Sequence, residues 1–205
     1  MPVVTVSRQY GAGGRRVAPA VAEELGFRFV DREIAEEAAR RLGLDPEVAR
    51  SMDERAPAIV EEVGMALAAA TPGYGLTPLP QQDERALAEA TRRVIVSLAD
   101  AGGYVVLGRG AQAVLVDRPD ACHLSLVADV KDRVRRIAEW QRVDQKEAAV
   151  RCERVDSERA HYLRRFYGRD IRDPLLYDCI LNTSRLPIES AAEVAVGVAR
   201  RKLGL

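Results

Sequence analysis

The sequence predicts a three-layer α/β fold, in which a parallel β-sheet is covered by helices on both faces. Short apolar runs alternate with longer amphipathic stretches throughout the 205 residues. The first run, at residues 3–6, leads through a glycine-rich turn directly into an amphipathic stretch from about Arg15 to Leu25. Strands that alternate with helices in this way pair in parallel and are buried on both sides.

Glycines mark the ends of helices in the first half of the chain. Gly26 ends the first helix, and the apolar run at 27–30 then predicts a short second strand that stops at Asp31. Apolar spacing predicts helices at 32–43, 45–70 and 83–101. Residues 71–82 contain three prolines and two glycines, which predicts a loop.

The second half of the chain repeats the alternation of strand and helix. Gly102 and Gly103 end the long helix, and a buried type of strand follows at 104–107. Further strands are predicted at 122–127 and 177–182, and further helices at 129–142, 146–165 and 188–203. Ligands of parallel sheets bind beyond the carboxyl ends of the strands. We therefore expect the segments that follow four of the strands to converge on one edge, namely Ser7–Gly14, Asp31, Gly108–Arg109 and Asn182–Ser184.

Composition excludes several classes of protein. Acidic and basic residues balance at 31 each, so net charge points neither to nucleic acid nor to a membrane surface. The three cysteines are widely spaced and odd in number, which disfavours a disulfide framework or zinc site and predicts a reducing, cytoplasmic location. We find no signal peptide and no apolar run long enough to span a membrane.

The glycine-rich turn is the strongest functional motif. Glycines allow the backbone to approach an anion closely, and the following helix directs the positive end of its dipole to the same point. This arrangement predicts a phosphate site made by Ser7, Gly11, Ala12, Gly13 and Gly14. A tight structural turn and a Rossmann-type loop are the alternatives.

The turn departs from the standard P-loop pattern, which continues with Lys and then Ser or Thr after its last glycine. Gly14 is followed instead by Arg15 and Arg16. Arg15 could supply the missing positive charge, whereas Arg16 stands where a hydroxyl would bind Mg²⁺. The metal would then be held by Ser7, by a carboxylate or mainly by the nucleotide.

Two polar residues follow strands singly. Asp31 could hold a substrate hydroxyl or orient Mg²⁺, or it could cap the helix at 32–43. Arg109 lies between two glycines, which keep its approach open, and its planar donors suit a phosphate. A surface charge is the alternative for Arg109.

A basic helical segment covers residues 131–172. It holds 13 Lys or Arg and 8 Asp or Glu, a local net charge of +5. Phosphoryl transfer needs cations around the migrating group, and an arginine-bearing lid meets that need and excludes water. A solvated helical face is the alternative. The arginines concerned are Arg133, Arg135, Arg136, Arg151, Arg154, Arg159, Arg164, Arg165 and Arg169.

Taken together, these segments resemble the cytidylate kinase-like branch of the P-loop nucleoside monophosphate kinases over nearly the whole chain. The resemblance is carried by VTVSRQYGAGGRRVA, FRFVDREI, YVVLGRGAQAVL, DRPDACHLSLVADVKDRVRRI, RCERVDSERA and DPLLYDCILNTSRLPIE. It implies a single domain with a P-loop NTPase core at 1–31, 102–141 and 173–205, an acceptor-binding helical region at about 32–100 and a lid at about 142–172.

The resemblance also implies roles for individual residues. Gly11 to Arg15 would hold the ATP phosphates, with Arg133 and Arg136 on the ATP side. Arg109 would contact the acceptor phosphate, in a region that begins at Asp31 and Arg32. Asp156 and Arg159 would read the pyrimidine nucleotide, and Arg164 and Arg165 would act from the lid. The expected reaction is phosphoryl transfer from ATP, with Mg²⁺, to CMP or dCMP by a monomer or homodimer.

The chain departs from this family pattern at several positions. Gly110 replaces the aspartate of Gly-Arg-Asp, Cys152 and Glu153 stand in place of Arg-Asp, and Asn182 replaces an aspartate in the last turn. These changes favour a kinase for another small acceptor as one alternative. The missing Lys and Ser/Thr favour a nucleotide-binding regulatory protein as another. A nucleic-acid-binding role is disfavoured by the neutral charge and few aromatic residues.

Overall fold

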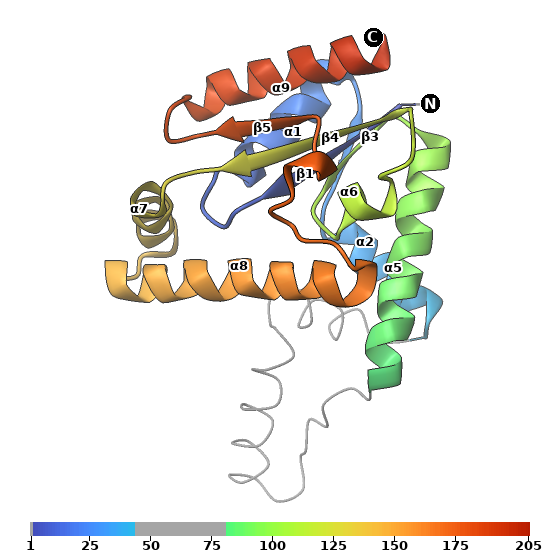
Figure 1. Cartoon of the computed structure of the whole chain (residues 1–205), viewed down its shortest axis with the longest axis horizontal. Coiled ribbons are helices and arrows are strands. Elements are labelled where there is room, and N and C mark those ends of the chain that lie inside the picture. Colours follow the sequence, from blue (N-terminus) through green and yellow to red (C-terminus); the bar gives the residue numbers. More distant parts are fainter. Residues whose placement is uncertain (1, 44–80) are drawn as a thin grey trace, which may run out of the picture. The chain divides into compact units, whose positions relative to one another are not determined.

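A five-stranded parallel sheet forms the centre of the computed structural model, which describes residues 2–43 and 81–205. The strands are β1 (Val3–Arg8), β2 (Arg28–Val30), β3 (Tyr104–Leu107), β4 (Ala121–Val127) and β5 (Cys179–Asn182). Their order across the sheet is β2-β3-β1-β4-β5, and every neighbouring pair is parallel (Figure 1). All five carboxyl ends therefore lie along one edge.

Two helices cover one face of the sheet and form the main core. Helix α1 (Gly14–Leu25) follows β1, and α9 (Ile188–Leu203) follows β5 (Figure 1). Val4 and Val6 of β1 pack with Val17 and Val21 of α1, and the small buried alanines of α9 complete the cluster. Small side chains let both helices lie close to the strands.

The opposite face is covered by α6 (Ala111–Val114) and contains a buried polar group. His123 of β4 lies between Thr5 Oγ1, 2.8 Å from Nδ1, and the carbonyl oxygen of Leu115, 3.2 Å from Nε2. Helices α7 (Val130–Gln141) and α8 (Gln145–Tyr167) pack together through Val134, Ile137 and Cys152. This packing places α8 beside the carboxyl edge.

The described residues divide into two compact units. One comprises residues 1–31 and 95–205, with the sheet and all the helices named above. The other, Arg32–Val94, contains α2 (Glu33–Arg41) and most of α5 (Gln81–Ala101). On α2, Ile34 and Ala38 are buried one turn apart, whereas Arg40 and Arg41 are exposed.

The structure confirms the predicted fold class and the order of the elements, with local differences. β1 extends two residues further, to Arg8, and β5 begins at Cys179 rather than at 177. Gln81 and Gln82 belong to α5, not to the predicted loop. The helix predicted at 45–70 and the rest of the loop lie outside the described residues. Two short elements were not predicted, α6 and a 3₁₀ turn at Pro174–Leu176.

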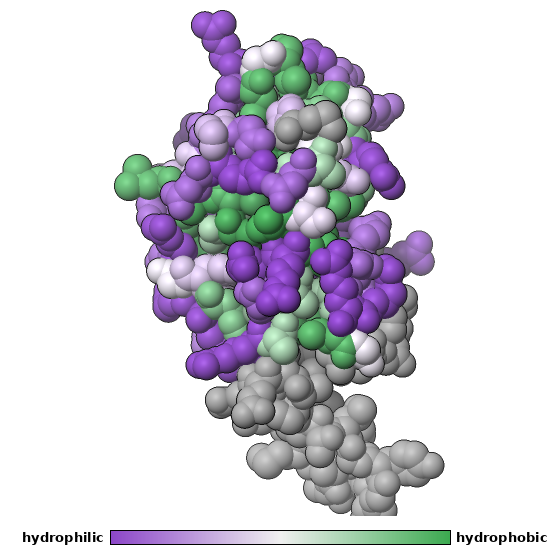
Figure 2. All heavy atoms as spheres, turned by 90° about the vertical axis from the view of Figure 1, so that its right-hand side faces the viewer, coloured by the Kyte–Doolittle hydropathy of each residue, from purple (hydrophilic) through white to green (hydrophobic). Residues whose placement is uncertain are grey.

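The surface is mixed in polarity. Hydrophilic and hydrophobic side chains are interspersed on the face shown in Figure 2. None of the described helices is both long and apolar enough to cross a membrane. Cys122, Cys152 and Cys179 are all free thiols.

Candidate functional site

The glycine loop joins β1 to α1 and is shaped by two left-handed residues. Gly11 has φ 81° and Gly13 has φ 90°. A Cβ at Gly11 would lie 2.8 Å from the carbonyl oxygen of Arg133, and one at Gly13 would lie 2.9 Å from Ile188 Cδ1. Both the conformation and the close packing therefore require glycine at these positions.

Helix α1 begins at Gly14 with an N-terminus suited to an anion. Its N-cap residue, Gly13, has no capping side chain, and the first turn holds no acidic residue. Arg16 and Val17 donate their N–H groups to the Gly13 carbonyl. The N–H groups of Gly14 and Arg15 have no helical carbonyl to bind, which leaves them directed along the helix axis towards the loop.

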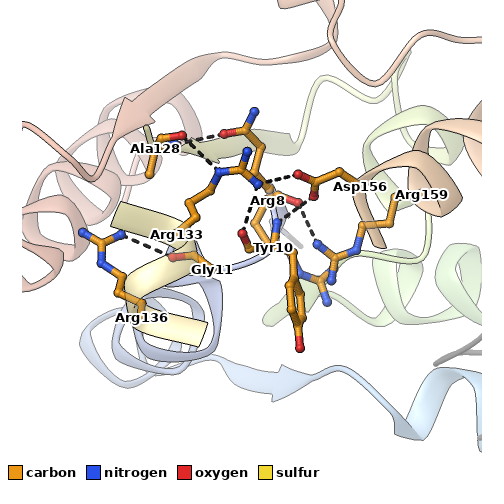
Figure 3. Close-up of polar contacts among 9 residues, drawn as sticks. Arg8, Tyr10, Gly11, Ala128, Arg133, Arg136, Asp156 and Arg159 are labelled. Carbon is orange, nitrogen blue, oxygen red and sulfur yellow. Dashed lines mark hydrogen bonds and ion pairs between the residues drawn. The ribbon is translucent and has the colours of Figure 1, made fainter. Parts of the chain in front are cut away.

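Arg133 and Asp156 both bind the backbone of the loop at Tyr10 (Figure 3). Arg133, whose side chain is only 8% exposed, donates from Nη1 to Asp156 Oδ2 at 2.5 Å and to the Tyr10 carbonyl at 3.2 Å. Its Nε donates to the Ala128 carbonyl at 3.1 Å. Asp156 in turn accepts the backbone N–H of Tyr10 at 2.7 Å. One buried ion pair thus connects α7, α8 and the loop.

Arg136 connects the loop to the turn after β5. Its Nη1 donates to the Gly11 carbonyl at 3.3 Å and to Thr183 Oγ1 at 3.0 Å, and its Nη2 donates to the Thr183 carbonyl at 2.7 Å. Thr183 Oγ1 also donates to the Ala12 carbonyl at 3.0 Å. Asn182 Oδ1 accepts the N–H of Ser184, so the amide in place of the family's aspartate still closes this turn.

Arg159 reaches the loop from α8. Its Nη1 donates to the Arg8 carbonyl at 3.0 Å, and its guanidinium lies 5.7 Å from the centre of the Tyr10 ring (Figure 3). Asp156 and Arg159, one turn apart on α8, therefore both contact the loop. Of the four segments expected to converge, the loop and the terminal turn are joined by the contacts of Arg136 and Thr183.

Arg109 has a strained backbone at the end of β3. It has φ 60°, between Gly108 at 78° and Gly110 at 70°. An arginine in the left-handed region is disfavoured by about 1 kcal/mol, and such strain is concentrated at functional sites. A Cβ at Gly110 would lie 2.7 Å from Tyr167 Cε2, so the tyrosine occupies the space that the family's aspartate would need.

Arg15, Arg16 and Ser7, which border the loop, each contact another side chain. Arg15 stacks 4.9 Å from the Trp140 ring, and Arg16 forms an exposed ion pair with Glu189. Ser7 is buried, with its Oγ 3.3 Å from the hydroxyl of Tyr177. Burial raises the pKa of Tyr177, which therefore stays protonated and donates to the Ile171 carbonyl.

The remaining predicted residues lie at the end of α8 and directly after β2. Arg164 and Arg165 are exposed in the last turn of α8, where Arg164 lies 3.8 Å from Asp170 and Arg165 stacks on Phe166. Asp31 directly follows β2 in the sheet unit, and Arg32 begins the second unit.

Cys152, which stands in place of the family's arginine, is buried between two helices. It is only 2% exposed, within the packing of α7 against α8, and burial raises its thiol pKa. Arg151 donates to Gln141, and Arg154 lies 3.7 Å from Glu158 on its own helix. Position 152 is thus a packing position.

Arg8, Tyr10 and Thr183 were expected only as members of the converging segments and were given no role of their own. Arg8 was assigned to the loop because the strand was ended at Val6. Tyr10 and Thr183 act through both backbone and side chain, with partners on α7 and α8 that local sequence patterns do not identify. For Arg8 the alternation of side chains along a strand was an available signal.

The donor set fits nucleotide phosphates, whereas protein ligands for Mg²⁺ are sparse. Within residues 2–43 and 81–205, no three His, Cys, Asp or Glu side chains gather as a metal site. The hydroxyl of Ser7 is buried beside Tyr177. The Mg²⁺ that accompanies ATP in kinases would therefore be held chiefly by the phosphates themselves.

A parallel sheet of this order, with a glycine loop leading into α1, defines the P-loop kinase fold. Solved structures agree at the level of fold. A shikimate kinase from Bacteroides thetaiotaomicron has a TM-score of 0.53 at 16% identity, over 100% of this chain and 99% of that one. An uncharacterized protein from Eubacterium ventriosum reaches 0.68 at 18% identity, over 97% and 98%.

The profile of the cytidylate kinase-like family matches residues 3–185, so the chain belongs to this family. A cytidylate kinase from Aeropyrum pernix is 33% identical over 146 residues, which is 70% of this chain and 79% of that protein. One from Pyrobaculum aerophilum is 26% identical over 198 residues, 96% and 91% of the two chains. Family and fold together support a nucleotide kinase activity.

Proposed function

We propose that this protein transfers the γ-phosphoryl group of ATP to a nucleoside monophosphate, with CMP or dCMP as the expected acceptor. One observation carries the proposal. The loop at the N-terminus of α1 and the strained Arg109 at the end of β3 lie at the same edge of the sheet and would serve as two anion-binding elements. Donor and acceptor phosphates could therefore be bound side by side.

The reaction needs positioning more than covalent chemistry. Backbone N–H groups of Gly11 to Arg15 would hold the ATP phosphates, and Arg109 would hold the acceptor phosphate. An oxygen of the acceptor phosphate forms a bond to the γ-phosphorus as the bond to the bridging oxygen breaks, and ADP leaves with that electron pair. The acceptor oxygen is already an anion, so no general base is required.

The arginines around the loop would fall into two groups. Arg133 and Arg136 bind backbone carbonyls and would fix the loop's shape on the ATP side. Arg159, with Asp156, would position the acceptor nucleotide next to the loop. Arg164 and Arg165 would approach from the lid, and Asp31 and Arg32 from the acceptor side. Ser7, Arg15 and Arg16 would border the ATP site.

A coupled ADP-release assay with Mg·ATP and a panel of nucleoside monophosphates tests this proposal. CMP or dCMP should stimulate ADP release most, and Arg109→Ala should lower the rate at least 100-fold. Arg200→Ala is the matched control, because Arg200 lies on α9 and donates to the Glu24 carbonyl. Wild-type rates that no monophosphate stimulates would contradict the proposal.

A kinase for another small acceptor is a second candidate, and the packing at Gly110 favours it. Tyr167 Cε2 and Leu163 Cδ1 would lie 2.7 and 3.1 Å from a Cβ there, so a carboxylate cannot occupy the family's position. An acceptor that hydrogen-bonds through that carboxylate would lose the contact. Screening sugar and shikimate-type hydroxyl acceptors in the same assay separates the two candidates.

A further inference from the structure

The side chain of Arg8 crosses the candidate site from one anion-binding element to the other. A Cβ placed on Gly14, at the start of α1, would lie 2.9 Å from Arg8 Cγ and 3.4 Å from Cδ. A Cβ placed on Gly108, at the end of β3, would lie 1.9 Å from Arg8 Nη1. The guanidinium therefore lies against Gly108, beside Arg109, and the aliphatic stem lies against Gly14.

The strand fixes this direction. Val4 and Val6 of β1 belong to the core under α1, whereas Ser7 faces Tyr177 on the other side of the sheet. Alternation places Arg8 on the α1 side. β1 pairs Arg8 with Leu126 of β4, and Arg159 donates to the Arg8 carbonyl, so its backbone is held from both sides.

The two glycines that Arg8 contacts are needed for its path. The start of α1 changes the alignment taken from the sequence: Gly13 is the last loop glycine, so Gly14, and not Arg15, takes the place of the lysine in the standard pattern. Any side chain at 14 would meet the stem of Arg8, and any at 108 would meet its guanidinium. A lysine at position 14 and an arginine at position 8 are thus incompatible, so the presence of Arg8 accounts for the absence of the lysine.

We propose that Arg8 supplies the cation that the lysine supplies in standard loops, placed between the donor phosphates and the acceptor phosphate. This inference rests on the proposed phosphoryl transfer. A guanidinium is longer and planar, and it can bind two phosphate oxygens at once. It remains protonated throughout, and a fixed cation at this point stabilises the charge of the migrating group. Arg15, beside Trp140, does not take this role.

The test combines single variants with an exchange. Arg8→Ala should lower the rate of ADP release about 100-fold and raise the Kd for ATP at least tenfold, with the Kd for adenosine unchanged. Arg8→Lys should recover part of both losses. Arg200→Ala, which lies outside the proposed machinery, should remain within about threefold of wild type.

The exchange moves the cation back to the lysine position. Gly14→Lys alone should lose activity because its Cβ meets Arg8. The double variant Arg8→Gly/Gly14→Lys removes this clash and should exceed Arg8→Ala at least tenfold in rate. A melting curve for each variant shows that it is folded, and Arg8→Gln provides a second neutral variant if Arg8→Ala does not fold.

Binding and turnover give separate answers. If the wild type binds ATP but phosphorylates none of the acceptors, the proposed function fails, yet the ratio of ATP to adenosine affinity still tests Arg8. The Arg8 inference is overturned if folded Arg8→Ala or Arg8→Gln keeps the wild-type Kd for ATP. It is overturned equally if the exchange is no better than Arg8→Ala.

Discussion

Asp156 links the backbone of the glycine loop to Arg133 of α7. It accepts the Tyr10 N–H and pairs with Arg133, whose side chain is 8% exposed against 28% for Asp156. A buried cation that loses its partner retains the cost of leaving water. The pair therefore acts mainly by fixing one loop conformation, which is a prerequisite for precise binding of phosphates.

Asp156→Asn tests this pair. The amide can still accept from Tyr10, but Arg133 loses its counter-charge, so we expect a loss of about 2 kcal/mol in the free energy of unfolding. Urea denaturation measures it. Glu147→Gln is the control, because Glu147 forms an exposed pair with Arg151 on the same helix and should change stability by about 0.5 kcal/mol or less. Equal losses in both variants would show that the buried pair contributes nothing special.

Arg109 combines strain with function, and two substitutions separate them. Arg109→Gly and Arg109→Ala both remove the guanidinium, but only glycine adopts φ 60° without strain. We expect the glycine variant to be more stable than the alanine variant by about 1 kcal/mol, with equally reduced ADP release. Thermal denaturation of the two variants decides the point. If the alanine variant is as stable, the left-handed conformation carries no strain.

The sequence predicts those parts of the site that are made by local backbone groups, but not those side chains whose positions depend on the packing of distant elements. The loop glycines, Arg109 and the helix N-terminus could be predicted because strand, turn and helix signals locate backbone groups directly. Arg133 was expected near ATP, and its burial could not be foreseen, because it depends on α8 packing against α7. Arg8 was given no role of its own because two further residues of β1 were read as loop.

At the scale of elements, long periodic segments were predicted well and short ones were not. The α8 helix was predicted at 146–165 and runs from Gln145 to Tyr167, since 23 residues give a clear pattern. The four residues of α6 give none. Asp144 and Gly168 end α8 by a side-chain cap and a left-handed residue. The caps fix where α8 begins and ends, and Asp156 and Arg159 contact the loop from the middle of this helix.

The packing of α8 on α7 gives a prediction at position 152. Cys152→Arg would restore the family's residue type but would place a cation beside Val134 and Ile137. We expect a loss of about 3 kcal/mol in the free energy of unfolding and no gain in nucleotide affinity. Glu153→Arg, one residue on and exposed, should change stability by about 0.5 kcal/mol or less. Urea denaturation and ATP titration measure both effects, and tighter ATP binding by Cys152→Arg would contradict the packing role.

At the scale of the whole molecule, the carboxyl edge of the sheet is charged, whereas the interior of the same sheet is neutral. Parallel pairing brings all the carboxyl ends together, where cations gather around the loop. The middle of the same strands holds His123, buried with Thr5 and the Leu115 carbonyl. Since a carbonyl only accepts, Nε2 carries a proton; burial lowers the pKa of His123 and favours the neutral imidazole, in which Nδ1 accepts from Thr5.

This buried histidine predicts how the fold responds to acid. Burial lowers the pKa of His123 below its usual 6.5, nearby Asp178 opposes that shift, and Lys202 adds to it. As pH falls below 6.5, the unfolded chain binds a proton that the folded chain does not. Stability should therefore fall with a slope of up to about 1.4 kcal/mol per pH unit, until the folded pKa is reached.

Urea denaturation between pH 8 and 5 should show a smaller slope for His123→Gln, which cannot take up this proton. His161→Gln, at the other, exposed histidine, is the control. If His123→Gln and wild type have parallel curves, the acid sensitivity arises from carboxylates rather than from the buried imidazole.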